Sequence, residues 1–324
     1  MNRIEDLINF VKWQIKIRLP DGGIYERTFG TENIRPEDKI RYYLYLCDMY
    51  SNKIQKYIYG NYRVSQRQLD EFFNFLNDNY SNGQYYSFML GDKVINLPIP
   101  EIRDRKVFRA ELFDLIFPYL AGYPHEVIPF HEGPYELGNV RLNSNDTVID
   151  AGANFGIFSA YASAMGCKVH AFEPTPSTCQ KYLNFTSMIN DNIMVHQKAL
   201  SNITGFYPFL TDDKNIGCNG LKASKSNILY HDLNEQTAPT ITIDEFKIEN
   251  GIKKIDFIKA DIEGAERLML EGAKKTLKDD APMLAVCYYH LLDDYKTLAN
   301  LITSTNNGYQ LQKRWKKIYA KASK

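Results

Sequence analysis

The sequence predicts an α/β fold in which helices cover both faces of a parallel sheet. From about residue 125 onward, apolar segments of strand length alternate with segments of helix length. Crossovers of helix length imply that the strands run parallel and that the helices pack on the sheet. Before residue 125 the chain is rich in aromatic residues and shows no nucleotide-binding motif. We therefore expect an N-terminal α+β accessory domain over residues 1–125 and an α/β domain over residues 126–324.

The accessory domain is predicted to contain two hairpins and three helices. Pro20 to Gly23 and Gly91-Asp92 supply turn residues for the two hairpins. Ser65, with Gln68 three residues later, is a capping-box pattern that begins a helix. In chain order, we expect strands at 13–19 and 24–29, helices at 36–59 and 65–79, strands at 85–90 and 94–99, and a helix at 105–120.

The α/β domain is predicted to alternate strands and helices, with a polar, irregular stretch at 211–237. We expect strands at 147–151, 168–172, 193–199, 255–260, 283–287, 309–311 and 318–320. We expect helices at 157–165, 175–189, 266–277 and 293–304. Ligands of such sheets bind at the carboxyl ends of the strands, so we expect the functional residues to lie at that edge of the sheet.

Composition argues against several classes of function. Lys and Arg together number 39, as do Asp and Glu, so no net charge attracts nucleic acid or an anionic membrane. The five cysteines form no CxxC pair, which argues against a disulfide framework and a structural zinc site. The N-terminus gains charge at Arg3, and the longest apolar run, 283–292, is too short to span a bilayer. We expect a soluble cytoplasmic protein that acts on a small molecule, without a nucleic-acid or membrane partner.

The strongest chemical signal is VIDAGANFG at residues 148–156. Gly152 and Gly156 allow the backbone to approach a ligand closely, and the following helix presents free N–H groups. A dinucleotide fingerprint would need glycine where Asn154 stands. Asp150 suits a cationic ligand group, so an adenosyl sulfonium with an amino-acid tail fits better than NAD. Taken alone, the segment also fits an ordinary tight turn between a strand and a helix.

Glu173, in AFEP at residues 171–174, ends the second predicted strand. It follows the glycine turn at about the interval that is usual for ribose recognition. A carboxylate there can accept hydrogen bonds from both ribose hydroxyls. Glu173 is therefore a predicted ligand residue, whereas without the glycine turn it would be a solvated acid at a strand end.

Acids also gather where the fourth predicted strand meets its helix. Lys259 and Asp261 share one face of the strand, and Glu263 and Glu266 follow in the first helical turn. His290 follows the next strand at the same sheet edge, and its ordinary pKa suits the removal of a hydroxyl proton. Three roles stay open for the acids: helix capping, general base catalysis, and binding of a divalent metal such as Mg²⁺ by Asp261 and Glu263. His290 is alternatively a histidine that is hydrogen-bonded in a loop.

Together these motifs resemble the FkbM family of methyltransferases over about residues 130–320. The resemblance rests on residues 148–156, on 172–174, on 257–266 and on His290, with GPYE at 133–136 upstream. The family commonly has isoleucine or valine where this chain has Ala260. The resemblance implies a class I, Rossmann-like methyltransferase sheet of seven strands with the last antiparallel, and S-adenosyl-L-methionine bound over the first two strand ends.

The resemblance and the motifs together give a candidate site. The predicted cofactor residues are Glu136, Asp150, Gly152, Asn154, Gly156, Phe158, Glu173, Pro174, Ala199, Leu200 and Asp261. The predicted catalytic residues are Asp261, Glu263, His290 and Lys259. Lys259 would orient a carboxylate or a substrate oxygen.

The resemblance also implies O-methylation of a sugar, such as a nucleotide-linked sugar for bacterial surface polysaccharide, or of a similar small polar metabolite. Two alternatives stay open. One is a methyltransferase of nucleic acid or protein; the neutral charge argues against a nucleic-acid substrate, and so does the lack of an Asn/Asp-Pro-Pro-aromatic tetrad at 261–264. The other is a non-catalytic interaction protein that keeps the nucleotide fold. Residues 1–125 would form a substrate lid, the interface of a homodimer, or both.

Overall fold

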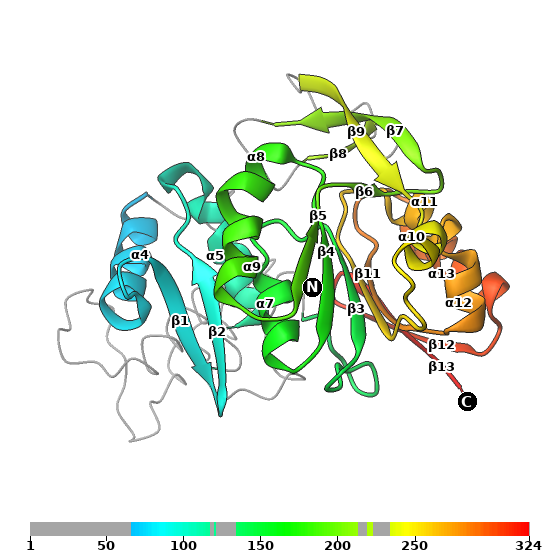
Figure 1. The fold of residues 1–324 in the computed structure, drawn as a ribbon, viewed down its shortest axis with the longest axis horizontal. Helices are drawn as coiled ribbons and strands as arrows, with labels where there is room; N and C mark the ends of the chain where they lie inside the picture. The colour runs from blue at the N-terminus through cyan, green and yellow to red at the C-terminus, as the bar shows by residue number, and fades with distance from the viewer. Residues whose placement is uncertain (1–65, 117–119, 121–133, 213–218, 223–233, 324) are drawn as a thin grey trace, which may run out of the picture.

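The computed structural model describes residues 66–116, 120, 134–212, 219–222 and 234–323. Seven strands form its central sheet, in the order β12-β13-β11-β10-β3-β4-β5 (Figure 1). Their bounds are β3 Thr147–Ala151, β4 Lys168–Phe172, β5 Ile193–His196, β10 Phe257–Ala260, β11 Met283–Cys287, β12 Tyr309–Arg314 and β13 Lys317–Ala322. Neighbouring strands pair in parallel except for β13, which is antiparallel to both β11 and β12. The predicted sheet of seven strands with the last antiparallel is confirmed.

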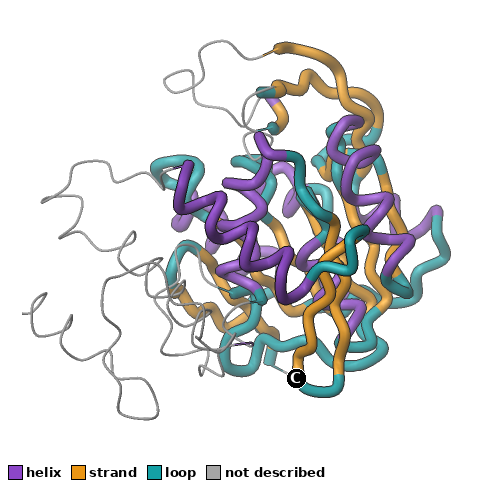
Figure 2. The backbone as a smooth tube through the Cα atoms, turned by 90° about the vertical axis from the view of Figure 1, so that its left-hand side faces the viewer, coloured by secondary structure: helices purple, strands orange, loops and turns teal. Residues whose placement is uncertain are grey.

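Helices cover both faces of this sheet (Figure 2). Val148 and Phe257 point toward α7 (Ile157–Ala164) in one hydrophobic core, whereas Ile149 and Ile258 point into a second core on the other face. This alternation buries both sides of each strand, which is why the strands read as continuous apolar runs. The second core is covered by α10 Ile243–Glu249, α11 Glu266–Glu271, α12 Lys274–Asp279 and α13 Asp294–Thr305. After β4, the chain continues through α8 Pro176–Thr178, the π-helical segment η2 Cys179–Leu183 and α9 Asn184–Ile189.

The described accessory elements pack onto the α7 side of the sheet. They are α4 Gln66–Tyr80, β1 Tyr85–Leu90, β2 Lys93–Pro98, the 3-10 turn η1 Ile102–Asp104 and α5 Arg105–Leu115. Phe108 of α5 meets Phe155 edge-to-face at 5.2 Å, and the Tyr182 hydroxyl donates to Asp104 at 2.5 Å. The predicted second hairpin and the helix after Ser65 are confirmed. The predictions at 13–29 and 36–59 lie outside the described residues.

A second sheet, of four strands, lies over the carboxyl edge of the first (Figure 1). Its strands are β6 Ala199–Leu200, β7 Gly205–Thr211, β8 Gly220–Leu221 and β9 Asn234–Ile241. The single strand predicted at 193–199 is therefore wrong. The backbone turns where the Lys198 N–H donates to the His196 carbonyl, so β5 stays in the main sheet and β6 pairs with β9.

The prediction of irregular structure at 211–237 is also wrong for the described residues there. β9 begins at Asn234, and its first four residues are all exposed. An exposed stretch of strand shows no alternation of apolar and polar residues, so the start of β9 could not be predicted from its pattern.

The helix predicted at 266–277 is two helices, α11 and α12, that meet at Gly272. A Cβ at Gly272 would lie 2.1 Å from the backbone oxygen of Ser201, so the junction depends on the absence of a side chain there. Within the described part of the chain, no helix combines the length and the apolar character that crossing a membrane requires.

Candidate active site

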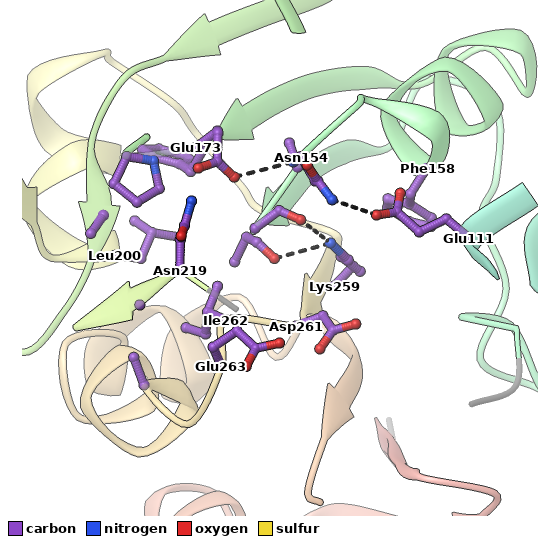
Figure 3. Close-up of a pocket in the computed structure, with 18 of the residues that line it drawn as sticks. Glu111, Asn154, Phe158, Glu173, Leu200, Asn219, Lys259, Asp261, Ile262 and Glu263 are labelled. Atoms are coloured by element: carbon purple, nitrogen blue, oxygen red, sulfur yellow. Dashed lines mark hydrogen bonds between the residues drawn. The ribbon is translucent and has the colours of Figure 1, made fainter. Parts of the chain in front are cut away.

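A pocket of about 430 Å³ lies at the carboxyl edge of the seven-stranded sheet (Figure 3). The ends of β3, β4 and β10 contribute to its lining, together with α5, the four-stranded sheet and the loop after β11. The predicted site residues that line it are Gly152, Asn154, Phe158, Glu173, Pro174, Ala199, Leu200, Lys259, Asp261 and Glu263. Four other predicted site residues, Glu136, Asp150, Gly156 and His290, are not part of its lining.

The glycine turn between β3 and α7 packs tightly against its neighbours. Gly152, with φ 75°, lines the pocket, and a Cβ there would lie 2.0 Å from the backbone oxygen of Asp261. A Cβ at Gly156 would lie 2.8 Å from Thr186 and 2.9 Å from Leu183. The sequence predicts that both glycines allow close approach of a ligand. The structure gives both a packing reason as well, and it leaves Gly156 beside α9 rather than in the pocket lining.

Asp150 and Lys259 form a buried ion pair beneath the turn. The Lys259 Nζ lies 2.9 Å from an Asp150 carboxylate oxygen, and the two side chains are 5% and 0% exposed. The Ser159 hydroxyl donates to the other Asp150 oxygen at 2.6 Å. Lys259 also donates to the carbonyls of Ala151 and Gly152, at 3.1 and 2.6 Å. Burial opposes the charge of Lys259, but Asp150 and Asp261 outweigh it, so its pKa is raised. Lys259 thus holds the turn in place and orients the Asp150 carboxylate.

Glu173, at the end of β4, faces the pocket opposite the turn. Its carboxylate accepts the backbone N–H of Asn154 at 3.2 Å and that of Thr175 at 2.9 Å. Burial raises its pKa, against the effect of these hydrogen bonds. Pro174, Ala199 and Leu200 line the same pocket, so Glu173 and these predicted cofactor residues are brought together.

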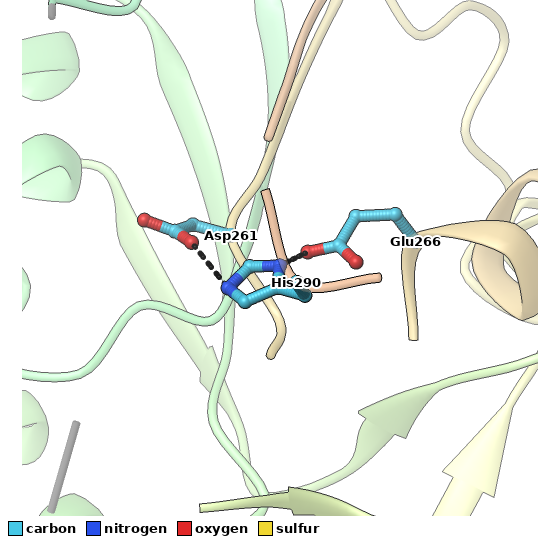
Figure 4. Close-up of side chains that lie close together, drawn as sticks. All are labelled: Asp261, Glu266 and His290. Atoms are coloured by element: carbon cyan, nitrogen blue, oxygen red, sulfur yellow. Dashed lines mark ion pairs between the residues drawn. The ribbon is translucent and has the colours of Figure 1, made fainter. Parts of the chain in front are cut away.

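Asp261 and Glu263 line the pocket. His290 is outside the pocket lining and lies close to both of them. The His290 Nε2 lies 3.7 Å from Asp261, and its Nδ1 lies 3.2 Å from Glu266 (Figure 4). The Nε2 also lies 3.6 Å from Glu263. Glu266 is fully buried and accepts the backbone N–H of Ile262 at 2.9 Å, which fixes the loop between β10 and α11. The N-cap of α11 is Ala265, without a side-chain cap bond, so helix capping is not the role of Glu266. Burial opposes the charge of His290, but the carboxylates outweigh it and raise its pKa to about 11. His290 is therefore an imidazolium at neutral pH rather than a free base.

The same cluster has the composition of a divalent cation site. Ligand atoms of Asp261, Glu266 and His290 all lie within 4.8 Å of one another. One imidazole and two carboxylates suit a divalent metal, but a protonated His290 neutralises the same acids without one. Glu263, predicted as a metal ligand with Asp261, faces His290 from the pocket side.

Tyr135 is a pocket residue that was not among the predicted site residues. Tyr135 lines the pocket, and its hydroxyl donates to Asp261 at 2.8 Å, whereas its neighbour Glu136 accepts the Leu142 N–H and the Tyr161 hydroxyl at 2.8 and 2.5 Å. Of the GPYE motif, Tyr135 rather than the predicted Glu136 lines the pocket.

Glu111, on α5, also lines the pocket and accepts the Asn154 side-chain N–H at 2.6 Å. Burial raises its pKa to about 8, although Lys259 and the Asn154 hydrogen bond act in the opposite direction. A single acid in an amphipathic helix gives no sequence signal, because most such acids are solvated.

The chain is similar to several known proteins. Residues 150–311 match the family described as "Methyltransferase FkbM domain". The methyltransferase sdnD of Sordaria araneosa is 28% identical over 172 residues, which cover 44% of this chain and about 65% of that curated relative. The solved methyltransferase FkbM from Methylobacillus flagellatus KT is similar with a TM-score of 0.42 and 21% identity, over 69% of this chain and 56% of that one. A SAM-dependent methyltransferase from Aquifex aeolicus has a TM-score of 0.30 and 14% identity, over 56% and 83%. The family match includes Glu173 and the acid cluster but leaves α5 outside.

Proposed function

Because this chain belongs to the FkbM methyltransferase family, we propose that it transfers a methyl group from S-adenosyl-L-methionine to a hydroxyl oxygen of a small polar acceptor. The observation that carries the proposal is a single pocket with Glu173 on one side of the glycine turn and Asp261 on the other. A carboxylate at the first position suits ribose hydroxyls, and one at the second suits proton removal from an acceptor.

The residues present fit the cofactor. Glu173 is fixed by two backbone N–H groups, so its carboxylate is oriented before any ligand arrives. Ala199 and Leu200 offer an apolar wall beside it for the adenine. When bound, the cofactor supplies an activated methyl group, so the protein has to position the acceptor and take up its proton.

Asp261 is the proposed base. The Asp261 carboxylate would take up the acceptor proton as the acceptor oxygen receives the methyl group that the bound cofactor would supply. Tyr135 and Tyr289 hold this side chain by donating to its two oxygens at 2.8 and 3.2 Å. His290, as an imidazolium, balances the negative charge of Asp261 and Glu263. Glu263, which also faces the pocket, is the second candidate for the base.

We propose that the acceptor is a sugar, such as a nucleotide-linked sugar for bacterial surface polysaccharide, or a metabolite of similar polarity. The polar edge made by Asp261, Glu263 and the tyrosine hydroxyls supports this class, because sugar hydroxyls need hydrogen-bond partners when they lose water. The equal numbers of basic and acidic residues, 39 each, favour a small acceptor over nucleic acid. A homodimer through residues 1–125 and a cytoplasmic location remain part of the proposal.

The test is calorimetric titration of the full chain with S-adenosylhomocysteine, in the presence of Mg²⁺ and then of a chelator. We expect binding in both conditions, because His290 neutralises the acid cluster without a metal. Affinity that is lost with the chelator and restored by Mg²⁺ would instead favour a cation held by Asp261 and Glu263. Absence of binding in both conditions would contradict the methyltransferase proposal.

A further inference from the structure

The amino-acid tail of S-adenosylmethionine ends in an α-ammonium group, and such a group is bound best by a carboxylate. Asp150 was the acid predicted to face a cationic group of the ligand. It is fully buried, outside the pocket lining, and its two oxygens are taken by Lys259 and Ser159. The carboxylate for the ammonium must therefore come from elsewhere in the pocket.

Apart from Glu111, the acids that line the pocket in the described residues are Asp114, Glu173, Asp261 and Glu263, and each of them, Asp114 included, has a partner. Glu173 accepts two backbone N–H groups. Asp261 accepts two tyrosine hydroxyls, and Glu263 faces His290 at 3.6 Å. Glu111 differs from these acids in its partners. Within the described part of the chain, Asn154 donates a hydrogen bond to it, and no cationic side chain lies within 4.0 Å of its carboxylate. Burying a carboxylate without a cation is costly, so Glu111 is the pocket acid that gains most from a cationic ligand.

The position of Glu111 relative to Glu173 matches the shape of the cofactor. Asn154 lies between them and donates its backbone N–H to Glu173 at 3.2 Å and its side-chain N–H to Glu111 at 2.6 Å (Figure 3). The ribose and the amino-acid tail are joined through one sulfur atom. A ligand whose ribose lies on Glu173 would therefore extend its tail past Asn154 toward α5.

We propose that Glu111 binds the α-ammonium group of S-adenosylmethionine, so that helix α5 completes the cofactor site. This inference rests on the proposed function. It assigns a binding role to a helix that precedes residues 150–311, and it makes the accessory segment necessary for recognition of the amino-acid half of the cofactor. The adenosine half depends on Glu173, Ala199 and Leu200 instead.

The experiment compares three ligands by calorimetry on the full chain and on Glu111→Gln. S-adenosylhomocysteine carries the whole tail, decarboxylated S-adenosylhomocysteine keeps the amino group, and 5′-methylthioadenosine lacks both tail groups. The glutamine keeps an oxygen to accept from Asn154 but removes the charge. We expect Glu111→Gln to weaken both amino ligands by about 10- to 100-fold, the usual effect of losing a hydrogen bond to a charged group. Binding of 5′-methylthioadenosine should change by less than about twofold.

The three ligands separate the possible outcomes. If Glu111→Gln weakens all three equally, Glu111 acts only by holding Asn154 and the inference is overturned. An unchanged affinity for S-adenosylhomocysteine also overturns it. Retained binding of 5′-methylthioadenosine shows that the variant is folded, and Glu111→Asp, which keeps the charge, should recover part of the lost affinity. If the unmodified chain binds none of the ligands, it is the proposed function that fails.

Discussion

At the scale of single residues, the Asp150–Lys259 pair makes a sharp prediction about stability. Lys259→Met would leave the fully buried Asp150 carboxylate without its cation. Breaking a buried pair from one side typically costs about 3–5 kcal/mol, because the remaining charge is uncompensated. Urea unfolding should show this loss.

An exposed pair provides the matched control. Lys222 and Glu235 lie 2.6 Å apart with side chains 52% and 51% exposed, so Lys222→Met should cost less than about 1 kcal/mol. The double variant Asp150→Asn/Lys259→Met should be more stable than Lys259→Met alone. A loss below about 1 kcal/mol for Lys259→Met would show that Asp150 is stabilised by other groups.

Residue patterns located the pocket acids but not all of their partners. Glu173 and Asp261 follow apolar strands, so their place at the sheet edge could be predicted from chain order. Asp150 pairs in register with Lys259 on a neighbouring strand, and no pattern within one strand reveals that register. Glu111 comes from a helix that is distant in sequence, so its contact with Asn154 exists only in the folded molecule.

At the scale of elements, the junction of α11 and α12 at Gly272 leads to a prediction about the stability of the fold. An alanine Cβ there would lie 2.1 Å from the Ser201 backbone oxygen, which a small side-chain rotation cannot relieve. Gly272→Ala should therefore destabilise the fold by about 1–3 kcal/mol or more, as measured by urea unfolding.

Gly308→Ala is the control, since its nearest neighbour is the flexible side chain of Asn306 at 3.1 Å. It should cost less than about 1 kcal/mol. Equal losses for the two alanine variants would mean that the Ser201 segment yields easily, and the close approach would then not explain the glycine.

Strands that are short apolar runs were predictable, and elements with a weak pattern were not. β3, β4 and β11 have the predicted bounds because each is a short apolar run. β7, β9 and helix α10 were missed. β9 is exposed over half its length and belongs to a sheet with a small core. Its residues therefore show little of the alternation between apolar and polar residues from which a strand is predicted.

At the scale of the whole molecule, a histidine pair links stability to pH. His170 and His196 lie between the main sheet and α10, with their ring nitrogens 3.1 Å apart and both rings packed against Phe246. Burial lowers the pKa of each to about 4. The folded protein therefore keeps both rings neutral below pH 6.5, where the unfolded chain binds protons. Linkage then requires stability to be complete above pH 6.5 and to fall as the pH drops toward 4.

Urea unfolding between pH 7.5 and 4.5 should show this loss, about 1–3 kcal/mol for the partly exposed pair after allowance for solvent screening. His290 acts in the opposite direction above about pH 6, because its pKa of about 11 keeps it protonated in the folded state while the unfolded chain loses its proton. The loss from the histidine pair is therefore measured below about pH 6, where His290 is protonated in both states. The double variant His170→Asn/His196→Gln removes both titrating rings, so its stability should depend less on pH in this window than that of the unmodified protein. An equally steep loss in the variant would assign the acid sensitivity to carboxylates elsewhere in the fold.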